Sequence, residues 1–283
     1  MSGWVELTRR IAAAGLAVAF AATLAVPAIS DVESAPDAAV SETSESVLAA
    51  AFRNRYSVDS NSNIELLMRS ASGREQSRHM QLVSKMIKGR LNSISRLSSP
   101  MYLRGTTILT IEKGGGSHDV FVFLPALDKV RRITTAQKGD AFFGSDITYE
   151  DLERRRIEEF DLDSLETAEF DGEAVYWIRG ALIRKGSYAR IEFIIAQSDS
   201  SILVTRYYKR GHESPYRIIT APRAMMVRQG GHVLPTRLIA SDELRGTKTE
   251  VLIRNLQVNP PLNDRLFTVA TLQQERKLPT PAE

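Results

Sequence analysis

The sequence predicts a mainly β protein, built as one antiparallel sheet that is strongly curved or closed into a barrel. Short segments rich in β-branched and aromatic residues recur between about Ile64 and Gln257. Turns rich in glycine, aspartate and serine separate these segments, as in a series of β-hairpins. No long helical segment lies between them, which argues against a parallel α/β sheet. Because no internal repeat is found either, we expect residues 46–283 to form a single domain.

The first 30 residues have the features of a secretory signal peptide. Arg9 and Arg10 precede an alanine-rich apolar stretch, residues 11–28, which ends in small side chains. We expect cleavage after Ala28 or Ser30 and therefore export to the periplasm. An uncleaved membrane anchor is the alternative, because the stretch is just long enough to span a bilayer. Residues 31–45 are rich in Asp, Glu, Ser, Ala and Pro, a composition that predicts a disordered lead-in.

One helix is predicted, at residues 46–56, followed by many strands. The helix is expected because Val47, Leu48, Ala51, Phe52 and Tyr56 fall near one helical face. The most clearly defined strands are expected at residues 107–113, 119–124, 129–134, 174–184, 189–196, 202–209, 217–228, 232–241 and 249–257, with a further strand pattern in the region of residues 80–86 and 101–103.

Two long hairpins suggest what such a sheet could do. Residues 167–182 and 220–239 are each expected to form a hairpin whose arms are near the upper end of common strand lengths. Long antiparallel arms curl, and a curled sheet has a concave face. If the sheet's own side chains do not fill that face, it becomes a ligand cavity.

The charge and the cysteine content exclude several classes of function. The net charge is only +3, and basic and acidic side chains are evenly mixed, so no basic face for a nucleic acid is expected. The longest basic run, residues 154–156, is flanked by acids and is expected to be a solvated face. The chain has no cysteine, which excludes disulfides, thiolate metal sites, a cysteine nucleophile and a lipid-modified N-terminal cysteine. We therefore expect a soluble protein after cleavage.

No motif predicts catalysis, a metal or a cofactor. His79, His118, His212 and His232 show no metal-ligand spacing, and three of them lie beside glycine or serine in expected solvent-facing turns. The triple glycine at residues 114–116 precedes a strand, so we interpret it as a hairpin turn rather than a phosphate-binding loop. The acids of residues 140–151 lack calcium-loop spacing. They fit instead a helix that starts near residue 145, with Ser145 or Asp146 as the cap.

Large apolar side chains at strand ends and in loops are the candidate ligand-binding residues. Methionine suits a surface that accepts variable apolar ligands, and two adjacent phenylalanines stand in an otherwise polar loop. For any single residue the alternative is ordinary core packing. The candidates for a lipid cavity or its lid are Phe142, Phe143, Tyr149, Leu127, Met101, Trp177, Met225 and Met226.

Three segments resemble a known family. The sequence FLPALDKVRRI at residues 123–133 is followed by GDAFFGSDITYEDL at residues 139–152, and VNPPLNDRLFT stands at residues 258–268. These segments resemble the LolA-like outer membrane lipoprotein-sorting proteins of Gram-negative bacteria. The resemblance extends from about residue 53 to residue 272. It implies an unclosed antiparallel β-barrel, or half-barrel, covered by a few helices, with an apolar interior that accommodates lipid.

The resemblance also implies a function. We expect a periplasmic carrier, without enzymatic activity, that shuttles acylated lipoprotein or another envelope lipid from the inner to the outer membrane. Phe142 and Phe143 would then lie on a lid segment at the cavity mouth. The expected partners are an inner-membrane exporter or RND-type transporter and an outer-membrane acceptor, and the protein is expected to be a monomer. A lipid-sensing or adaptor module is the main alternative, and a hydrolase acting on an envelope lipid is the third.

Overall fold

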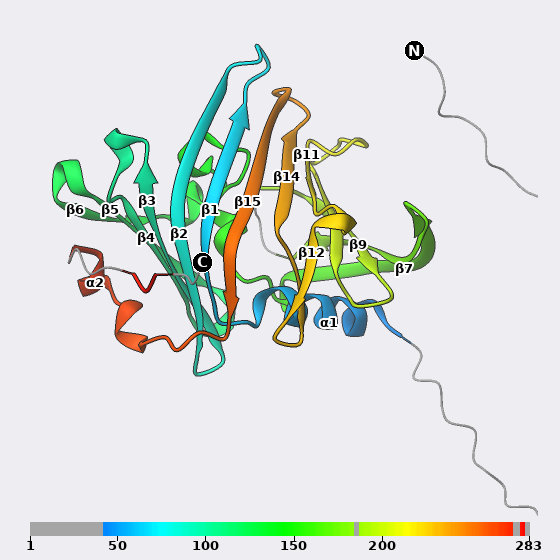
Figure 1. Cartoon of the computed structure of the whole chain (residues 1–283). Coiled ribbons are helices and arrows are strands. Elements are labelled where there is room, and N and C mark those ends of the chain that lie inside the picture. Colours follow the sequence, from blue (N-terminus) through cyan, green and yellow to red (C-terminus); the bar gives the residue numbers. More distant parts are fainter. Residues whose placement is uncertain (1–41, 184–186, 274–277, 281–283) are drawn as a thin grey trace, which may run out of the picture. The chain divides into compact units, whose positions relative to one another are not determined.

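A large open antiparallel sheet dominates the fold. The computed structural model describes residues 42–183, 187–273 and 278–280. The expected signal peptide and most of the expected lead-in, residues 31–41, lie outside these residues. Thirteen strands form one sheet in the order β6-β5-β4-β3-β2-β1-β15-β14-β11-β10-β9-β8-β7. Each end strand is paired on one side only, so the sheet is not closed (Figure 1). The expected mainly β, unclosed architecture is confirmed.

The strands are long in the middle of the sheet and shorter towards β6. Their bounds are β1 Ser60–Arg69, β2 Glu75–Ile87, β3 Arg90–Ser99, β4 Thr107–Glu112, β5 His118–Leu124, β6 Lys129–Ile133, β7 Phe160–Phe170, β8 Glu173–Leu182, β9 Arg190–Ala196, β10 Ile202–Tyr208, β11 Arg217–Thr220, β14 Arg237–Asp242 and β15 Thr247–Val258; β12 Met226–Gln229 and β13 His232–Pro235 form a separate hairpin.

Three expected strands are corrected. Residues 232–241 form two strands, β13 and β14, which belong to different sheets, and the hairpin expected at residues 220–239 is reduced to β12 and β13. Residues 217–228 do not form one strand, because Pro222 has no N–H for the ladder and the chain turns through a 3-10 helix, η8 Arg223–Met225. β11 therefore pairs with β14, and β12 forms the small hairpin with β13. Met101 and Leu103 were expected to alternate in a strand, but they belong to a 3-10 turn, η1 Met101–Leu103, which follows Pro100.

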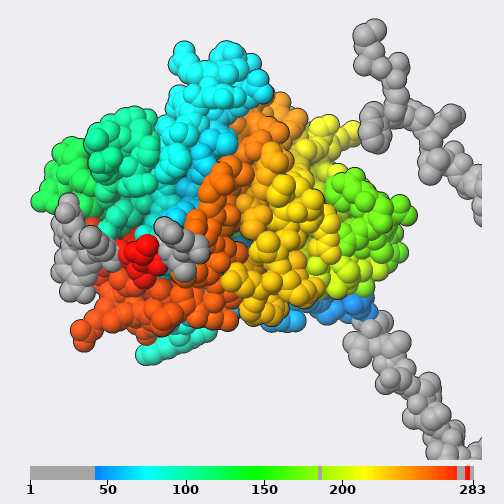
Figure 2. All heavy atoms as spheres, in the orientation of Figure 1, coloured from blue at the N-terminus to red at the C-terminus, as the bar shows by residue number. Residues whose placement is uncertain are grey.

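Alternation of side chains gives the sheet two distinct faces. In β1, Ile64, Leu66 and Met68 are buried, whereas Asn63 and Leu67, at alternate positions, are exposed. We name the face that carries Ile64 and Leu66 the inner face and the opposite one the outer face. The short helix α2 Val269–Gln273 and the C-terminal segment pack on the outer face, where Leu272 and Leu278 contact a cluster with Val83, Ile94 and Leu109. Figure 2 shows this segment, in orange-red, lying over that part of the sheet.

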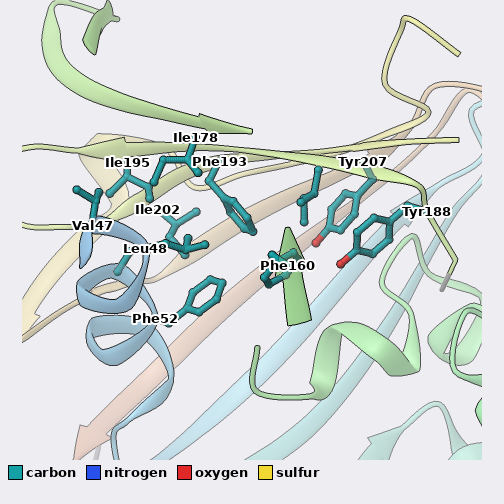
Figure 3. Packing of buried hydrophobic residues seen from close by; sticks show 12 residues of the cluster. Val47, Leu48, Phe52, Phe160, Ile178, Tyr188, Phe193, Ile195, Ile202 and Tyr207 are labelled. Atoms are coloured by element: carbon teal, nitrogen blue, oxygen red, sulfur yellow. The ribbon is translucent and has the colours of Figure 1, made fainter. Parts of the chain in front are cut away.

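The helix α1 Ser44–Tyr56 covers the inner face at β7–β10. Its N-terminus is fixed by a capping box between Thr43 and Ser46, so it begins two residues before the expected position 46. Val47, Leu48 and Phe52 point from α1 towards the strands, as the expected helical face requires (Figure 3). They belong to a cluster with residues in or next to these strands: Phe160, Ile178, Tyr188, Ile191, Phe193, Ile195, Ile202 and Tyr207.

The remaining part of the inner face is covered by residues 135–159, which we name the lid segment. It connects β6 to β7 through four 3-10 turns: η4 Thr135–Gln137, η5 Phe142–Gly144, η6 Tyr149–Leu152 and η7 Ile157–Glu159. Its apolar side chains pack against inner-face residues of β1, β2, β14 and β15. Among the described residues, no helix is long and apolar enough to cross a membrane.

Candidate functional site

A cavity of about 290 Å³ lies between the inner face, the lid segment and the C-terminal end of α1. Eighteen apolar residues line it: Val58, Ile64, Leu66, Met80, Leu82, Leu91, Phe142, Ile147, Leu152, Ile202, Ile219, Ala221, Leu234, Pro235, Leu238, Val251, Ile253 and Leu256. This volume is near the lower end of the range for pockets that bind small molecules. The lining is mostly apolar, so the cavity fits an apolar group better than a polar metabolite.

The period-two repeat of the strands produces this lining. In β1 the lining residues are at positions 60, 62, 64 and 66, and in β2 they are at positions 80, 82 and 84. The register places Ile64 opposite both Met80 and Ile253, so β1, β2 and β15 contribute to one continuous wall. A shift of one residue in any of these strands would turn its apolar side chains to the outer face.

Asp146 anchors the lid segment to β15. Its carboxylate accepts hydrogen bonds from the Thr249 hydroxyl at 2.8 Å and from the Arg245 guanidinium at 2.9 Å. Its backbone N–H donates to the Thr249 hydroxyl oxygen at 2.9 Å. The expectation that Ser145 or Asp146 caps a helix is therefore wrong. The cap of η6 is Thr148, which forms a capping box with Asp151, because the side chain of Asp146 is engaged by the sheet.

A buried ion pair between Asp151 and Arg217 fixes the lid segment to β11. Both terminal guanidinium nitrogens donate to the carboxylate, Nη1 at 2.5 Å and Nη2 at 3.0 Å. The two side chains are 9% and 3% exposed. Burial by itself raises the pKa of Asp151, but the charge and hydrogen bonds of Arg217 outweigh burial, and the pKa is lowered. Asp151 is therefore held as an anion, and its partner neutralises it.

The basic run at residues 154–156 is not a solvated face, contrary to expectation. The Arg155 side chain is buried and lies 3.1 Å from the Glu150 carboxylate and 3.5 Å from that of Glu159. Arg154 pairs at 3.1 Å with Glu112, whose side chain is fully buried in β4. Two of the acids that flank the run in sequence, Glu150 and Glu159, thus pair with Arg155, while Glu112 links Arg154 to β4.

His118 is also buried rather than solvent-facing, because it begins β5 underneath the lid segment. Its ring lies 3.5 Å from the Glu153 carboxylate, and Glu153 contacts the Lys138 ammonium at 2.6 Å. Burial, helped by the positive charges of Lys138 and Arg155, lowers the pKa of His118 from 6.5 to about 3. Burial raises the pKa of Glu153 from 4.5 to about 6, against the opposing effect of Lys138.

The predicted site residues divide into three groups. Phe142 lines the cavity and is 3% exposed; its ring meets those of Phe143 and Tyr149 edge to face at 4.8 and 5.6 Å. Phe143, Tyr149 and Met226 pack against the same apolar cluster but are not among the lining residues.

The other four predicted residues lie away from the cavity wall. Met101 is 71% exposed in η1, Leu127 is 52% exposed in η3 Pro125–Leu127, and Met225 is 40% exposed in η8. Trp177 lies on the other side of β8 from the buried Ile178, with its ring beside the guanidinium groups of Arg179 and Arg206. Most lining residues were missed, although the alternation in β1 and β2 could have indicated them.

The open sheet, its covering lid segment and the apolar cavity between them define a fold of the LolA-like class. A crystal structure described as an outer membrane lipoprotein-sorting protein domain from Vibrio parahaemolyticus matches with a TM-score of 0.75 and 21% identity, over 81% of this chain and 97% of that one. A LolA superfamily protein from Nitrosomonas europaea matches with a TM-score of 0.64 and 20% identity, over 81% and 99%. The resemblance expected from the sequence is confirmed as a likeness of fold.

A match of the sequence to a family model assigns the chain to a family. A family model described as "Uncharacterized protein" matches residues 89–274, and the chain belongs to that family. A crystal structure of a DUF1329 family protein from Desulfovibrio piger matches with a TM-score of 0.70 and 22% identity, over 76% of this chain and 91% of that one. No curated protein matches the sequence.

Proposed function

We propose that this protein is a periplasmic carrier that binds the acyl chains of a lipoprotein, or another envelope lipid, in the cavity of the inner face. The carrier moves this cargo from the inner to the outer membrane. The observation that carries the proposal is the apolar cavity beneath an anchored lid segment, within a fold shared with a protein described as lipoprotein-sorting. The signal-peptide pattern of residues 1–30, in which Arg9 and Arg10 precede an apolar stretch, supports export to the periplasm.

The energetics of acyl burial fit this role. Burying a methylene group is worth about 0.8 kcal/mol, so a palmitoyl chain represents about 12 kcal/mol of transfer free energy. A carrier has to recover a large part of this free energy and still release its cargo. A segment that covers the cavity from one side and can move away is one way to combine both requirements.

A binding role is favoured over a catalytic one by the state of the charged groups. Asp151 and Arg155 both line the cavity, and each is already paired with an oppositely charged side chain, Arg217 and Glu150 respectively. Charges used in this way stabilise the lid segment and are not available as an acid or a base. The proposed partners are an inner-membrane exporter or RND-type transporter that loads the carrier and an outer-membrane acceptor that unloads it.

A variant that fills the cavity tests the proposal. Ala221 lines the cavity and is 3% exposed, so Ala221→Phe places a ring in the space proposed for the acyl chain. Affinity for a fluorescent fatty-acid analogue should fall at least about tenfold, equivalent to about 1.4 kcal/mol, because fewer methylene groups can be buried. Ala168→Phe, at an exposed position of β7, is the matched control and should leave affinity unchanged. Equal affinity in a folded Ala221→Phe protein would contradict the proposal.

A further inference from the structure

One end of the cavity wall is polar. Five serines of three neighbouring strands line it: Ser60 and Ser62 in β1, Ser84 in β2, and Ser93 and Ser95 in β3. Ser60 lies opposite Ser84, and Ser84 lies opposite Ser93, so these three form a row across the strands. Ser62 and Ser95 both lie opposite Leu82, two residues further along their strands towards the apolar part of the wall. The serines therefore form one patch, which we name the serine patch.

The hydroxyl groups of the serine patch differ in their hydrogen bonding from the polar groups at the other end of the cavity. None of the five has a hydrogen-bond partner within the part of the chain that the structure describes. At the lid end of the cavity the situation is the opposite, because Asp151 is bonded by Arg217 and by the Tyr207 hydroxyl at 3.3 Å. Polar groups at the lid end thus hold the fold together, whereas those of the serine patch are free to contact a ligand.

Arg55 also lines the cavity, and it is close in the chain to the serine patch. It is in the last turn of α1, and only residues 57–59 separate this helix from β1, where Ser60 begins the patch. The side chain is partly buried, and its guanidinium lies 5.7 Å from the centre of the Tyr56 ring. Among the described residues, no carboxylate pairs with it. The nearest acid in sequence, Asp59, instead accepts a hydrogen bond from the Met86 backbone N–H at 2.7 Å.

This combination selects the charge of the ligand. Guanidinium has only donors, and a hydroxyl group can donate as well as accept, so the end of the cavity can surround an anion completely with donors. A partly buried cation without a partner is unfavourable, and an anionic ligand group would remove this cost. A neutral head group would satisfy the serines and leave Arg55 unpaired.

We propose that Arg55 and the serine patch bind the anionic head group of the cargo, a carboxylate or a phosphate ester. The acyl chain then extends along the apolar wall towards Phe142 and the lid segment. This inference rests on the proposed lipid-binding function and adds to it the class of head group and the direction of the bound chain. A lipoprotein whose acyl chains carry no anionic group at this position would bind by its chains alone.

Three ligands with the same chain separate the head group from the tail. Hexadecanoic acid, hexadecyl phosphate and hexadecanol are each used to displace the neutral fluorescent probe N-phenylnaphthylamine from the full mature protein at slightly alkaline pH. We expect at least one anion to bind about tenfold more tightly than the alcohol, since a hydrogen bond to a charged group is stronger than one between neutral groups. The ranking of acid and phosphate identifies which head group fits better.

Matched variants assign the effect to Arg55. Arg55→Gln should weaken the preferred anion about tenfold and leave the alcohol unchanged. Arg53→Gln removes the same charge from the same helical turn but from an exposed position, and should change neither ligand. Replacing Ser84 and Ser93 together with alanine should also weaken the anion, because two hydrogen bonds are lost.

Each contrary result has a distinct meaning. If the alcohol binds as tightly as both anions, or if Arg53→Gln acts like Arg55→Gln, the head-group site is refuted while the lipid cavity stands. An unchanged anion affinity in the double serine variant refutes the role of the serine patch. If none of the three ligands displaces the probe, the proposed lipid-binding function fails and the head-group site fails with it.

Discussion

At the scale of single residues, the two phenylalanines of the lid segment have different environments. Phe142 is 3% exposed and packs against the apolar inner face, whereas Phe143 is partly exposed and has a backbone φ of 48°, in the left-handed region. Such a conformation is costly for a bulky residue and persists only where the surroundings impose it. The ring of Phe142, which contacts the rings of both Phe143 and Tyr149, is part of those surroundings.

We therefore predict unequal effects of truncating the two rings. Phe142→Ala should lower the free energy of unfolding by about 3–5 kcal/mol, as is usual for a buried phenylalanine. Phe143→Ala should cost less, because a partly exposed ring has less burial to lose. Urea unfolding of both variants measures the difference. Equal losses would show that Phe143 is as deeply packed as Phe142 in solution.

The buried His118 should make stability depend on pH. Its pKa is about 3 in the folded protein and 6.5 when exposed, so the unfolded state binds more protons between these values. The contribution of neutral His118 to the free energy of unfolding is fully present above pH 6.5 and is lost as the pH falls towards 3. Glu153, whose pKa is raised from 4.5 to about 6, acts in the opposite direction. Its contribution to the free energy of unfolding is lost as the pH rises from 4.5 through 6.

Comparison with a variant isolates the histidine. Between pH 6.5 and 3 the wild type should lose stability relative to His118→Gln, by up to about 1.4 kcal/mol per pH unit. Urea unfolding at several pH values measures this difference. His79→Gln, at a side chain that is 46% exposed, is the matched control and should give no such trend. A constant difference between the wild type and His118→Gln would contradict the burial of His118.

These residues also mark the limit of prediction from sequence. His118 follows Gly116 and Ser117, and Arg155 stands among acids, so local composition indicates solvent in both cases. Both are buried because the lid segment folds back over β4 and β5, which brings Glu153 to His118 and places Arg155 beside Glu150 and Glu159. Contacts of this kind depend on the path of the chain, and no local pattern encodes them.

At the scale of elements, the lid segment is fixed by buried polar contacts more than by regular structure. Asp151 is its main link to β11, and the buried Arg217 would lose its carboxylate partner if Asp151 were neutralised. Asp151→Asn should therefore lower the free energy of unfolding by about 3–5 kcal/mol. The matched control is Asp119→Asn, whose partner Arg132 is 66% exposed and whose loss should cost at most about 1 kcal/mol. Similar losses in urea unfolding would contradict the buried pair.

Elements with a clear alternation were predictable, and interrupted ones were not. The strands at 107–112, 118–124 and 190–196 lie within a residue or two of their expected positions, since β-branched residues and turn glycines bound them. The expected helix begins two residues early at Ser44 and ends as predicted at Tyr56. The expectation for residues 217–228 was wrong because β11 and β12 both contain β-branched residues, and the short break at Pro222 and η8 between them places them in different sheets.

At the scale of the whole molecule, the open sheet and its cavity were predictable, but the wall of the cavity was not. Hairpin turns and strand lengths already indicate a curled antiparallel sheet. The wall depends on the pairing of β1 with β15, in which Ile64 lies opposite Ile253, far away in the sequence. The sequence therefore pointed to conspicuous residues such as Met101 and Leu127, which are exposed, and not to the strand residues that line the cavity.

The measurement that tests the central claim most directly is native mass spectrometry of the protein purified from the periplasm under mild conditions. A lipid carrier should retain a stoichiometric lipid or acylated peptide, which is released on denaturation and is reduced or absent in Ala221→Phe. Ala168→Phe should retain it like the wild type. Protein without lipid but with a stable protein partner would favour an adaptor module, and cleaved lipid without a retained ligand would favour a hydrolase. Either of these results would contradict the carrier.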